Sequence, residues 1–110
     1  MTDNNRLLLE LERKIREINR AIINPEFPHI GIEDISPVMR MVANSRAAYL
    51  KELFDIGKSS EEGTPSPEKI NKLRQLRETY EEMVQATKAL ETAIQRGYLD
   101  VKTREAGSGQ

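Results

Sequence analysis

The chain has 110 residues, enough for one small domain, and its 17 basic and 18 acidic residues leave a formal net charge of -1. Because the charges nearly balance, the net charge does not favour binding to a strongly charged partner such as naked nucleic acid or an anionic membrane. The absence of cysteine excludes disulfides, thiolate nucleophiles and cysteine zinc sites, and the single histidine, His29, cannot form a multi-histidine metal site. We therefore expect no catalytic residue, no cofactor and no metal. Because the apolar runs are short, we expect no membrane span and a cytoplasmic location.

The first predicted helix covers residues 2–24 and ends where Pro25 disfavours helical geometry in the residue before it. Apolar residues recur along it at intervals of three and four, the heptad spacing that keeps one face toward a partner helix. We call this face the leucine–isoleucine seam; it consists of Leu8, Leu11, Ile15, Ile18 and Ile22. Leu7 and Leu9 add apolar surface that a three-helix monomer would leave uncovered, which makes them candidate interaction residues.

A basic stripe on the same helix lies opposite the leucine–isoleucine seam. It consists of Arg6, Arg13, Arg16 and Arg20, three of which recur every seven residues. Arginines at this spacing could contact the phosphates of a nucleic acid. Glu10 and Glu17 flank the stripe and no aromatic residue interleaves it for base stacking, so we favour a solvated helix face over a nucleic-acid site.

The second predicted helix covers residues 37–56, with Ser36 as its cap, Pro37 at its first position and Gly57 as a left-handed C-terminal cap. Its apolar face is wide enough to pack against two other helices. That face consists of Met39, Val42, Ala43, Ala47, Tyr49, Leu50, Leu53 and Phe54. Arg46 lies within it, and a charge there needs a partner. We favour a structural role, either an ion pair with a carboxylate on another helix or a guanidinium that snorkels at the edge of the apolar face. A site for an anion or a partner's carboxylate is the alternative.

The third predicted helix covers residues 67–97 and repeats the cap-plus-proline start with Ser66 and Pro67. Its heptad positions are Leu73, Leu76, Tyr80, Met83, Thr87, Leu90 and Ile94. Tyr80, like Tyr49 of the second helix, is expected to be a core aromatic with its hydroxyl at the rim, and both are candidate interaction residues. Residues 98–101 are expected to fold back, and the tail at 102–110 to be disordered.

Together these elements predict an all-α, three-helix bundle within a single domain, residues 1–101. The first and third helices are expected to be long, antiparallel and coiled-coil-like, and the middle helix shorter. A chain of this size with two heptad seams favours a homodimer. The predicted function is a non-enzymatic protein–protein interaction module: an adaptor, a chaperone-like protein or a regulatory subunit. The alternatives are an accessory subunit of a nucleoprotein complex, acting through the basic stripe, and an enzyme with an anion site at Arg46.

One enzyme family resembles part of the first helix. Residues 13–20, RKIREINR, are similar to the opening helix of the all-helical chorismate mutases, whose active site is assembled from arginines of intertwined helices. The likeness covers about one helix. Arg16 and Asn19 stand where that family carries acidic residues, so no catalytic residue is carried over to this chain.

Overall fold

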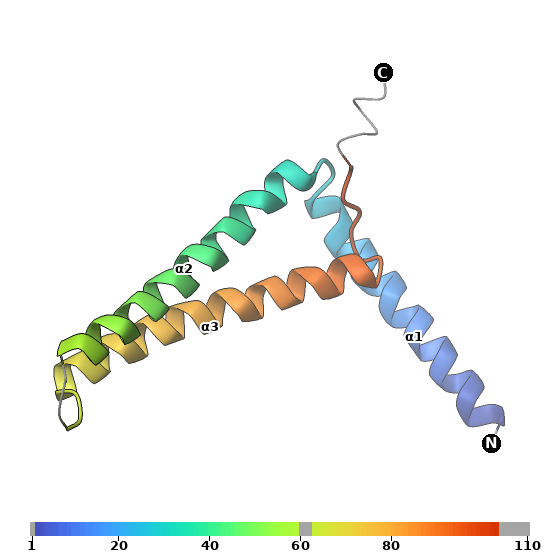
Figure 1. Ribbon diagram of the computed structural model, residues 1–110. Helices are drawn as coiled ribbons and strands as arrows, with labels where there is room; N and C mark the ends of the chain where they lie inside the picture. Colours follow the sequence, from blue (N-terminus) through green and yellow to red (C-terminus); the bar gives the residue numbers. More distant parts are fainter. Residues whose placement is uncertain (1, 60–62, 104–110) are drawn as a thin grey trace. The chain divides into compact units, whose positions relative to one another are not determined.

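The computed structural model describes residues 2–59 and 63–103. In these residues the chain forms three α-helices, α1 (Thr2–Ile23), α2 (Ile32–Ser59) and α3 (Pro67–Gln95), and one short 3-10 helix, η1 (Asn24–Glu26) (Figure 1). Within the same residues, β pairing is limited to an isolated bridge between Gly31 and Lys102. The predicted all-α fold with three helices is confirmed.

The chain divides into two compact units, and the division cuts through α2 and α3. The hairpin unit is Ser36–Lys88, and the α1 unit combines Met1–Ile35 with Ala89–Gln110. The expectation that residues 1–101 behave as one domain stays a prediction. Of the predicted disordered tail, residues 104–110 lie outside the described part of the chain. Lys102, by contrast, has a fixed place, because its backbone amide donates a hydrogen bond to the carbonyl of Ile30 over 3.0 Å.

In the hairpin unit, α2 and α3 run antiparallel and side by side, as Figure 1 shows near the turn that joins them. We call their contact the hairpin seam; its members are all buried or half-buried and recur at intervals of three and four. They are Val42, Ser45, Tyr49, Glu52 and Ile56 on α2, with Leu73, Leu76, Tyr80, Met83 and Thr87 on α3. The Thr87 hydroxyl donates to the Met83 carbonyl over 2.8 Å, so this buried polar group is satisfied within its own helix.

Three features of α2 differ from the prediction. The helix begins at Ile32, because the Gly31 amide donates to the Asp34 carboxylate over 2.8 Å and the Asp34 amide donates back to the Gly31 carbonyl over 2.9 Å. This reciprocal cap stabilises an earlier start, and Pro37 lies inside the helix. Gly57 also lies inside it and has no positive φ. With 28 residues against 29 for α3 and 22 for α1, the middle helix is not the shortest one.

The predicted apolar face of α2 is only partly covered within the hairpin unit. Val42 and Ile56 are 7% and 6% exposed, whereas the second apolar stripe of the helix is 45% to 66% exposed. That stripe consists of Met39, Leu50, Leu53 and Phe54. The reason is geometric: a single neighbouring helix covers a narrow strip of heptad positions, and α3 covers the strip that contains Val42 and Ile56.

The core of the α1 unit lies where the end of α3 meets the end of α1. Gly97 adopts φ 74°, a left-handed conformation that glycine tolerates, and the chain reverses direction there. The reversal brings Tyr98 and Leu99 against Ala93, with Ile23, Ile30, Leu90 and Val101 packed around them. The predicted return of residues 98–101 is therefore confirmed.

Candidate interaction surface

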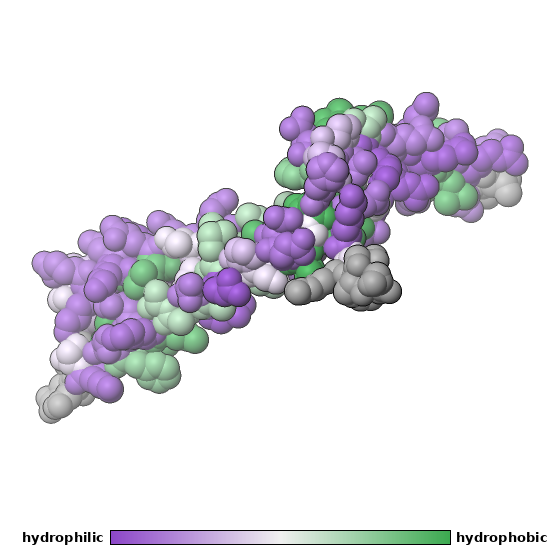
Figure 2. Space-filling view, turned by 90° about the horizontal axis from the view of Figure 1, so that it is seen from above, coloured by the Kyte–Doolittle hydropathy of each residue, from purple (hydrophilic) through white to green (hydrophobic). Residues whose placement is uncertain are grey.

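The leucine–isoleucine seam lies on the surface of α1. The exposed fractions of its residues are 57% for Leu8, 52% for Leu11, 41% for Ile15, 56% for Ile18 and 67% for Ile22. Leu7 and Leu9 beside it are 64% and 68% exposed. Figure 2 shows hydrophobic side chains interrupting the hydrophilic surface near the first residues of α1. A contiguous row of half-exposed leucine and isoleucine residues is the kind of surface that marks a protein interaction site.

The contacts that anchor α1 in its unit come from a different side of the helix. Arg20 donates to the Gly97 carbonyl over 2.8 Å and to the Asp100 carboxylate over 2.7 Å. Asn24, just beyond α1, accepts a hydrogen bond from the Asp100 amide, and Ile23 packs on the core cluster. At 100° per residue, Arg20 lies about 160° from the centre of the leucine–isoleucine seam. These contacts, which we call the anchor of α1, therefore leave most of the leucine–isoleucine seam open to a partner.

One member of the seam borders the C-terminal turn. Ile15, with Glu12 and Arg16 of α1, lines a surface depression of about 420 Å³ whose other side is formed by Gln95, Arg96 and Tyr98. This neighbourhood explains why Ile15 is the least exposed of the five seam residues. The other four do not line the depression, so the turn partly covers the seam only at its central residue.

In the α1 unit, the ion pair between Arg20 and Asp100 shifts the pKa of both side chains. The hydrogen bond from the Arg20 guanidinium lowers the pKa of the Asp100 carboxyl from its ordinary value of 3.8. The same hydrogen bond raises the pKa of Arg20, which is charged at all accessible pH values in any case. Both side chains are partly exposed, so this pair positions the C-terminal turn but is screened by solvent.

The basic stripe of α1 is partly neutralised. Arg13 forms an ion pair with Glu10, and Arg20 is engaged by Asp100 and Gly97. Arg6 and Arg16 line an open surface depression together with Leu9, Glu10 and Glu12, so carboxylates lie between the cations. The four arginines thus do not form a continuous cationic surface of the kind that follows a phosphate backbone.

The structure brings Arg46, Tyr49 and Tyr80 together and places Arg46 at the exposed edge of the helix pair. Arg46 is exposed, and its Nε donates to the Tyr80 hydroxyl over 3.1 Å. Its guanidinium carbon lies 5.3 Å from the centre of the Tyr80 ring, which is a cation–π geometry. The Tyr80 and Tyr49 rings are 6.1 Å apart and tilted by 32°. The partner of Arg46 is therefore an aromatic side chain rather than a carboxylate, and its exposure agrees with a guanidinium that snorkels at the edge of the apolar face.

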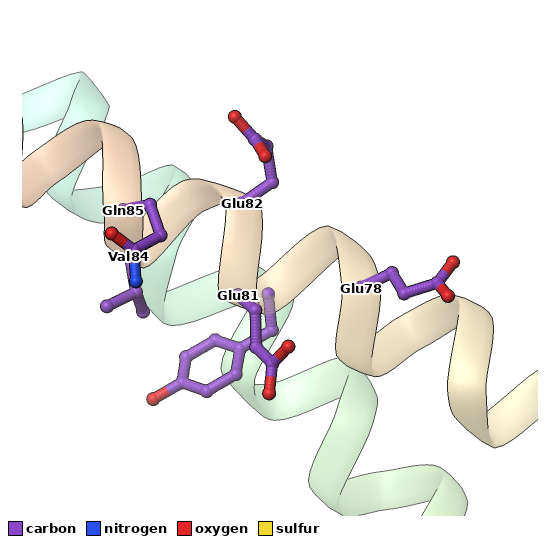
Figure 3. Close-up of a pocket in the computed structure, with 6 residues that line it drawn as sticks. Glu78, Glu81, Glu82, Val84 and Gln85 are labelled. Atoms are coloured by element: carbon purple, nitrogen blue, oxygen red, sulfur yellow. The ribbon is translucent and has the colours of Figure 1, made fainter.

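An acidic surface on α3 is the other distinct feature of the hairpin unit. An open depression is lined by Glu78, Tyr80, Glu81, Glu82, Val84 and Gln85, five of which are labelled in Figure 3. Figure 3 shows Glu81 and Glu82 projecting to different sides of the helix. Arg77 lies 3.9 Å from the Glu81 carboxylate. Since all the lining residues come from one helix, the carboxylates do not converge on a common point where a substrate atom could be held.

Comparisons with known proteins add no family or functional assignment: no family model, curated protein or solved structure matches this chain. In the described residues, no helix is long and apolar enough to cross a membrane. The same residues hold no group of three or more metal-ligating side chains that could bind an ion together. The leucine–isoleucine seam of α1 and the second apolar stripe of α2 are both exposed apolar surfaces, and the seam is the longer of the two.

Proposed function

We propose that this protein is a non-enzymatic protein–protein interaction module and that α1 is its docking helix. The observation that carries the proposal is the leucine–isoleucine seam, five heptad-spaced apolar residues that are 41% to 67% exposed on a helix anchored from another side. An adaptor, chaperone-like or regulatory role, and a cytoplasmic location, belong to the same proposal.

The energetics of the seam support a partner that is itself an apolar helix. Full burial of a leucine or isoleucine side chain contributes about 1.5–3 kcal/mol, so burying the exposed half of five such residues contributes roughly 5 kcal/mol. Association costs at least about 4 kcal/mol in lost translational and rotational freedom. A polar partner surface would leave almost no net affinity, whereas a partner with its own apolar stripe roughly doubles the favourable contribution.

Photo-crosslinking in the native host tests the docking role of α1. A benzophenone amino acid is placed at Ile18, in the middle of the seam, and in a matched variant at Arg13, on the opposite side of the same helix. We expect a protein adduct of defined mass from the position 18 variant and none from the position 13 variant. Equal adducts at both positions, or no adduct at position 18, would contradict the proposal.

A filter-binding titration addresses the nucleoprotein alternative, which the ion pairs of Arg13 and Arg20 disfavour. We expect no saturable binding of single- or double-stranded RNA or DNA at physiological salt. Saturable binding that weakens steeply with salt and is lost in an Arg6→Ala, Arg16→Ala double variant would favour the alternative.

A further inference from the structure

We propose that the partner of the leucine–isoleucine seam is the α1 helix of a second copy of this chain, aligned in parallel. This inference rests on the proposed docking role of α1 and names its partner. The support comes from the residue types in the heptad, the charges beside it and the side of α1 that the anchor occupies.

The heptad of α1 places Leu8, Ile15 and Ile22 at the a positions, with Leu11 and Ile18 at the d positions. Isoleucine at a with leucine at d, as in Ile15 and Leu11, favours parallel two-stranded coiled coils, whereas isoleucine at both positions, as in Ile15 and Ile18, shifts the preference toward more strands. In a parallel pair each residue meets its own counterpart, so all five layers are apolar. The seam is therefore complementary to itself without any register shift.

The number of apolar layers, together with the charges beside the seam, distinguishes the two orientations. In the parallel pair, Lys14 at g faces Asn19 at e of the other copy, and Leu7 faces Glu12, so no like charges meet. One antiparallel register with four apolar layers pairs Leu8 with Ile18 and Leu11 with Ile15.

That antiparallel register places Lys14 opposite Lys14 and Glu12 opposite Glu12 of the other copy, and such like-charge pairs are destabilising. Shifting the antiparallel helices by one heptad pairs Leu11 with Ile22 and Ile15 with Ile18 and brings no like charges together, but it also has only four apolar layers. The parallel pair has five apolar layers, and this larger number favours it over both antiparallel registers.

The anchor of α1 is compatible with this pairing. Arg20, which holds the C-terminal turn through Gly97 and Asp100, occupies an f position, the heptad position farthest from the a and d residues. Glu10 and Arg13, at c and f, also pair with each other away from the seam. Ile15, the central a residue, borders the turn at Gln95, Arg96 and Tyr98, so the second helix has to approach the seam from the side that faces away from the turn. Because the seam spans only about two heptads, we expect a micromolar dimer.

Cysteine crosslinking tests both the partner and the orientation, since the chain has no cysteine of its own. Leu11→Cys places a thiol in a d layer, where a parallel pair brings the two sulfurs within disulfide distance. We expect mild oxidation to give a covalent dimer at least tenfold faster than for Arg13→Cys, the matched control on the opposite side. Faster crosslinking between Leu11→Cys and Ile15→Cys copies, or between Ile15→Cys and Ile18→Cys copies, than within the single variants would overturn the parallel orientation.

Light scattering of the purified chain tests the association itself. We expect the mass to rise from 12.6 kDa toward twice that value as the protein concentration increases over the micromolar range. In an Ile18→Asp variant, we expect the dissociation constant of the dimer to be at least tenfold higher. Phe54→Asp, at a 66% exposed position on α2, is the control and should dimerise like the wild type. Circular dichroism should show that the hairpin unit stays helical in both variants.

Light scattering and photo-crosslinking together distinguish failure of this inference from failure of the docking role. A purified chain that stays at 12.6 kDa throughout, while position 18 crosslinks to a different protein in the native host, overturns the self-pairing and leaves the docking role intact. A monomeric chain with no adduct at position 18 overturns both. Loss of association in Phe54→Asp but not in Ile18→Asp would move the interface to α2 and also overturn the inference.

Discussion

The hairpin seam and the leucine–isoleucine seam have the same heptad spacing but differ in how far their residues are buried. The hairpin seam includes polar residues, Ser45, Glu52 and Thr87, yet its members are buried or half-buried between α2 and α3. The leucine–isoleucine seam is wholly apolar, yet its five residues are 41% to 67% exposed. The more hydrophobic of the two seams is the one that lacks a partner. Hydrophobicity at heptad spacing therefore indicates that a face needs cover, whereas chain connectivity decides whether that cover is available.

Polar residues are tolerated in the hairpin seam because each finds a local partner. The Ser45 hydroxyl donates to the Val42 carbonyl over 2.9 Å, and the Glu52 carboxylate, 14% exposed, lies 3.4 Å from the Lys72 ammonium. Satisfied polar groups cost little on burial and restrict the register. The α1 seam lacks such groups, so its register is set by packing and flanking charge alone.

Equivalent truncations in the two seams should have very different effects on stability. Ile56→Ala removes a 6% exposed side chain and should lower the free energy of unfolding of the hairpin unit by about 2–4 kcal/mol. Ile15→Ala, at a 41% exposed position, should cost under about 1 kcal/mol in dilute solution, partly because alanine is a better helix former. Urea denaturation followed by circular dichroism measures both. Similar losses would mean that the α1 seam is covered in the monomer.

The ion pair between Glu52 of the hairpin seam and Lys72 allows a second comparison of the two seams. Lys72→Met leaves the Glu52 carboxylate largely buried without its cation and should destabilise the hairpin by about 1–2 kcal/mol. Glu52→Leu with Lys72→Met should restore stability to near the wild-type value, since it replaces the pair with apolar contacts. Denaturation of the single and double variants measures the coupling. Additive losses would show that the two residues act independently.

Arg46→Met tests the contact at the rim of the hairpin seam. Because Arg46 is exposed and contacts Tyr80 through a cation–π geometry and one hydrogen bond, its loss should cost about 0.5–1 kcal/mol. Tyr80→Phe keeps the ring and should cost less, and Arg40→Met on an exposed turn of the same helix should be neutral. Thermal melts compare the three. A loss several times larger for Arg46→Met would indicate a buried ion pair.

The smallest expected effect concerns the anchor of α1. The pKa of the Asp100 carboxyl is lowered by the Arg20 hydrogen bond, so near pH 3.8 the unfolded chain binds the proton more readily than the folded one. The stabilisation is present above pH 3.8 and is lost as pH falls through the lower folded value. NMR shifts of Leu99 and Val101 should report a small loosening of the turn in acid. Asp100→Asn should remove this pH dependence, and an unchanged profile in that variant would contradict the role of the pair.

Local chemistry predicted much of the molecule. The start of α3 at Pro67, the end of α1 before Pro25 and the heptad positions of both helices follow from prolines, caps and apolar spacing within a few residues. The cap that begins α2 at Ile32 is also local, but its signal, a glycine three residues before an aspartate, is weaker than the Ser36–Pro37 pair that we preferred. The candidate residues Leu7 and Leu9 were found in the same way, from their place beside a seam.

The remaining features depend on residues far apart in the sequence. Arg46 meets Tyr80 across 34 positions, and Arg20 meets Asp100 across 80. No periodicity within one helix encodes such a pairing, since it depends on how the helices cross and where the chain turns. By itself, the sequence determined that there are three helices and which faces are apolar, because both follow from the backbone geometry of each segment. Only the tertiary structure decided which stripe of α2 is covered and that α1 is held by Arg20 rather than by its leucine–isoleucine seam, because each helix has more than one face that could be buried.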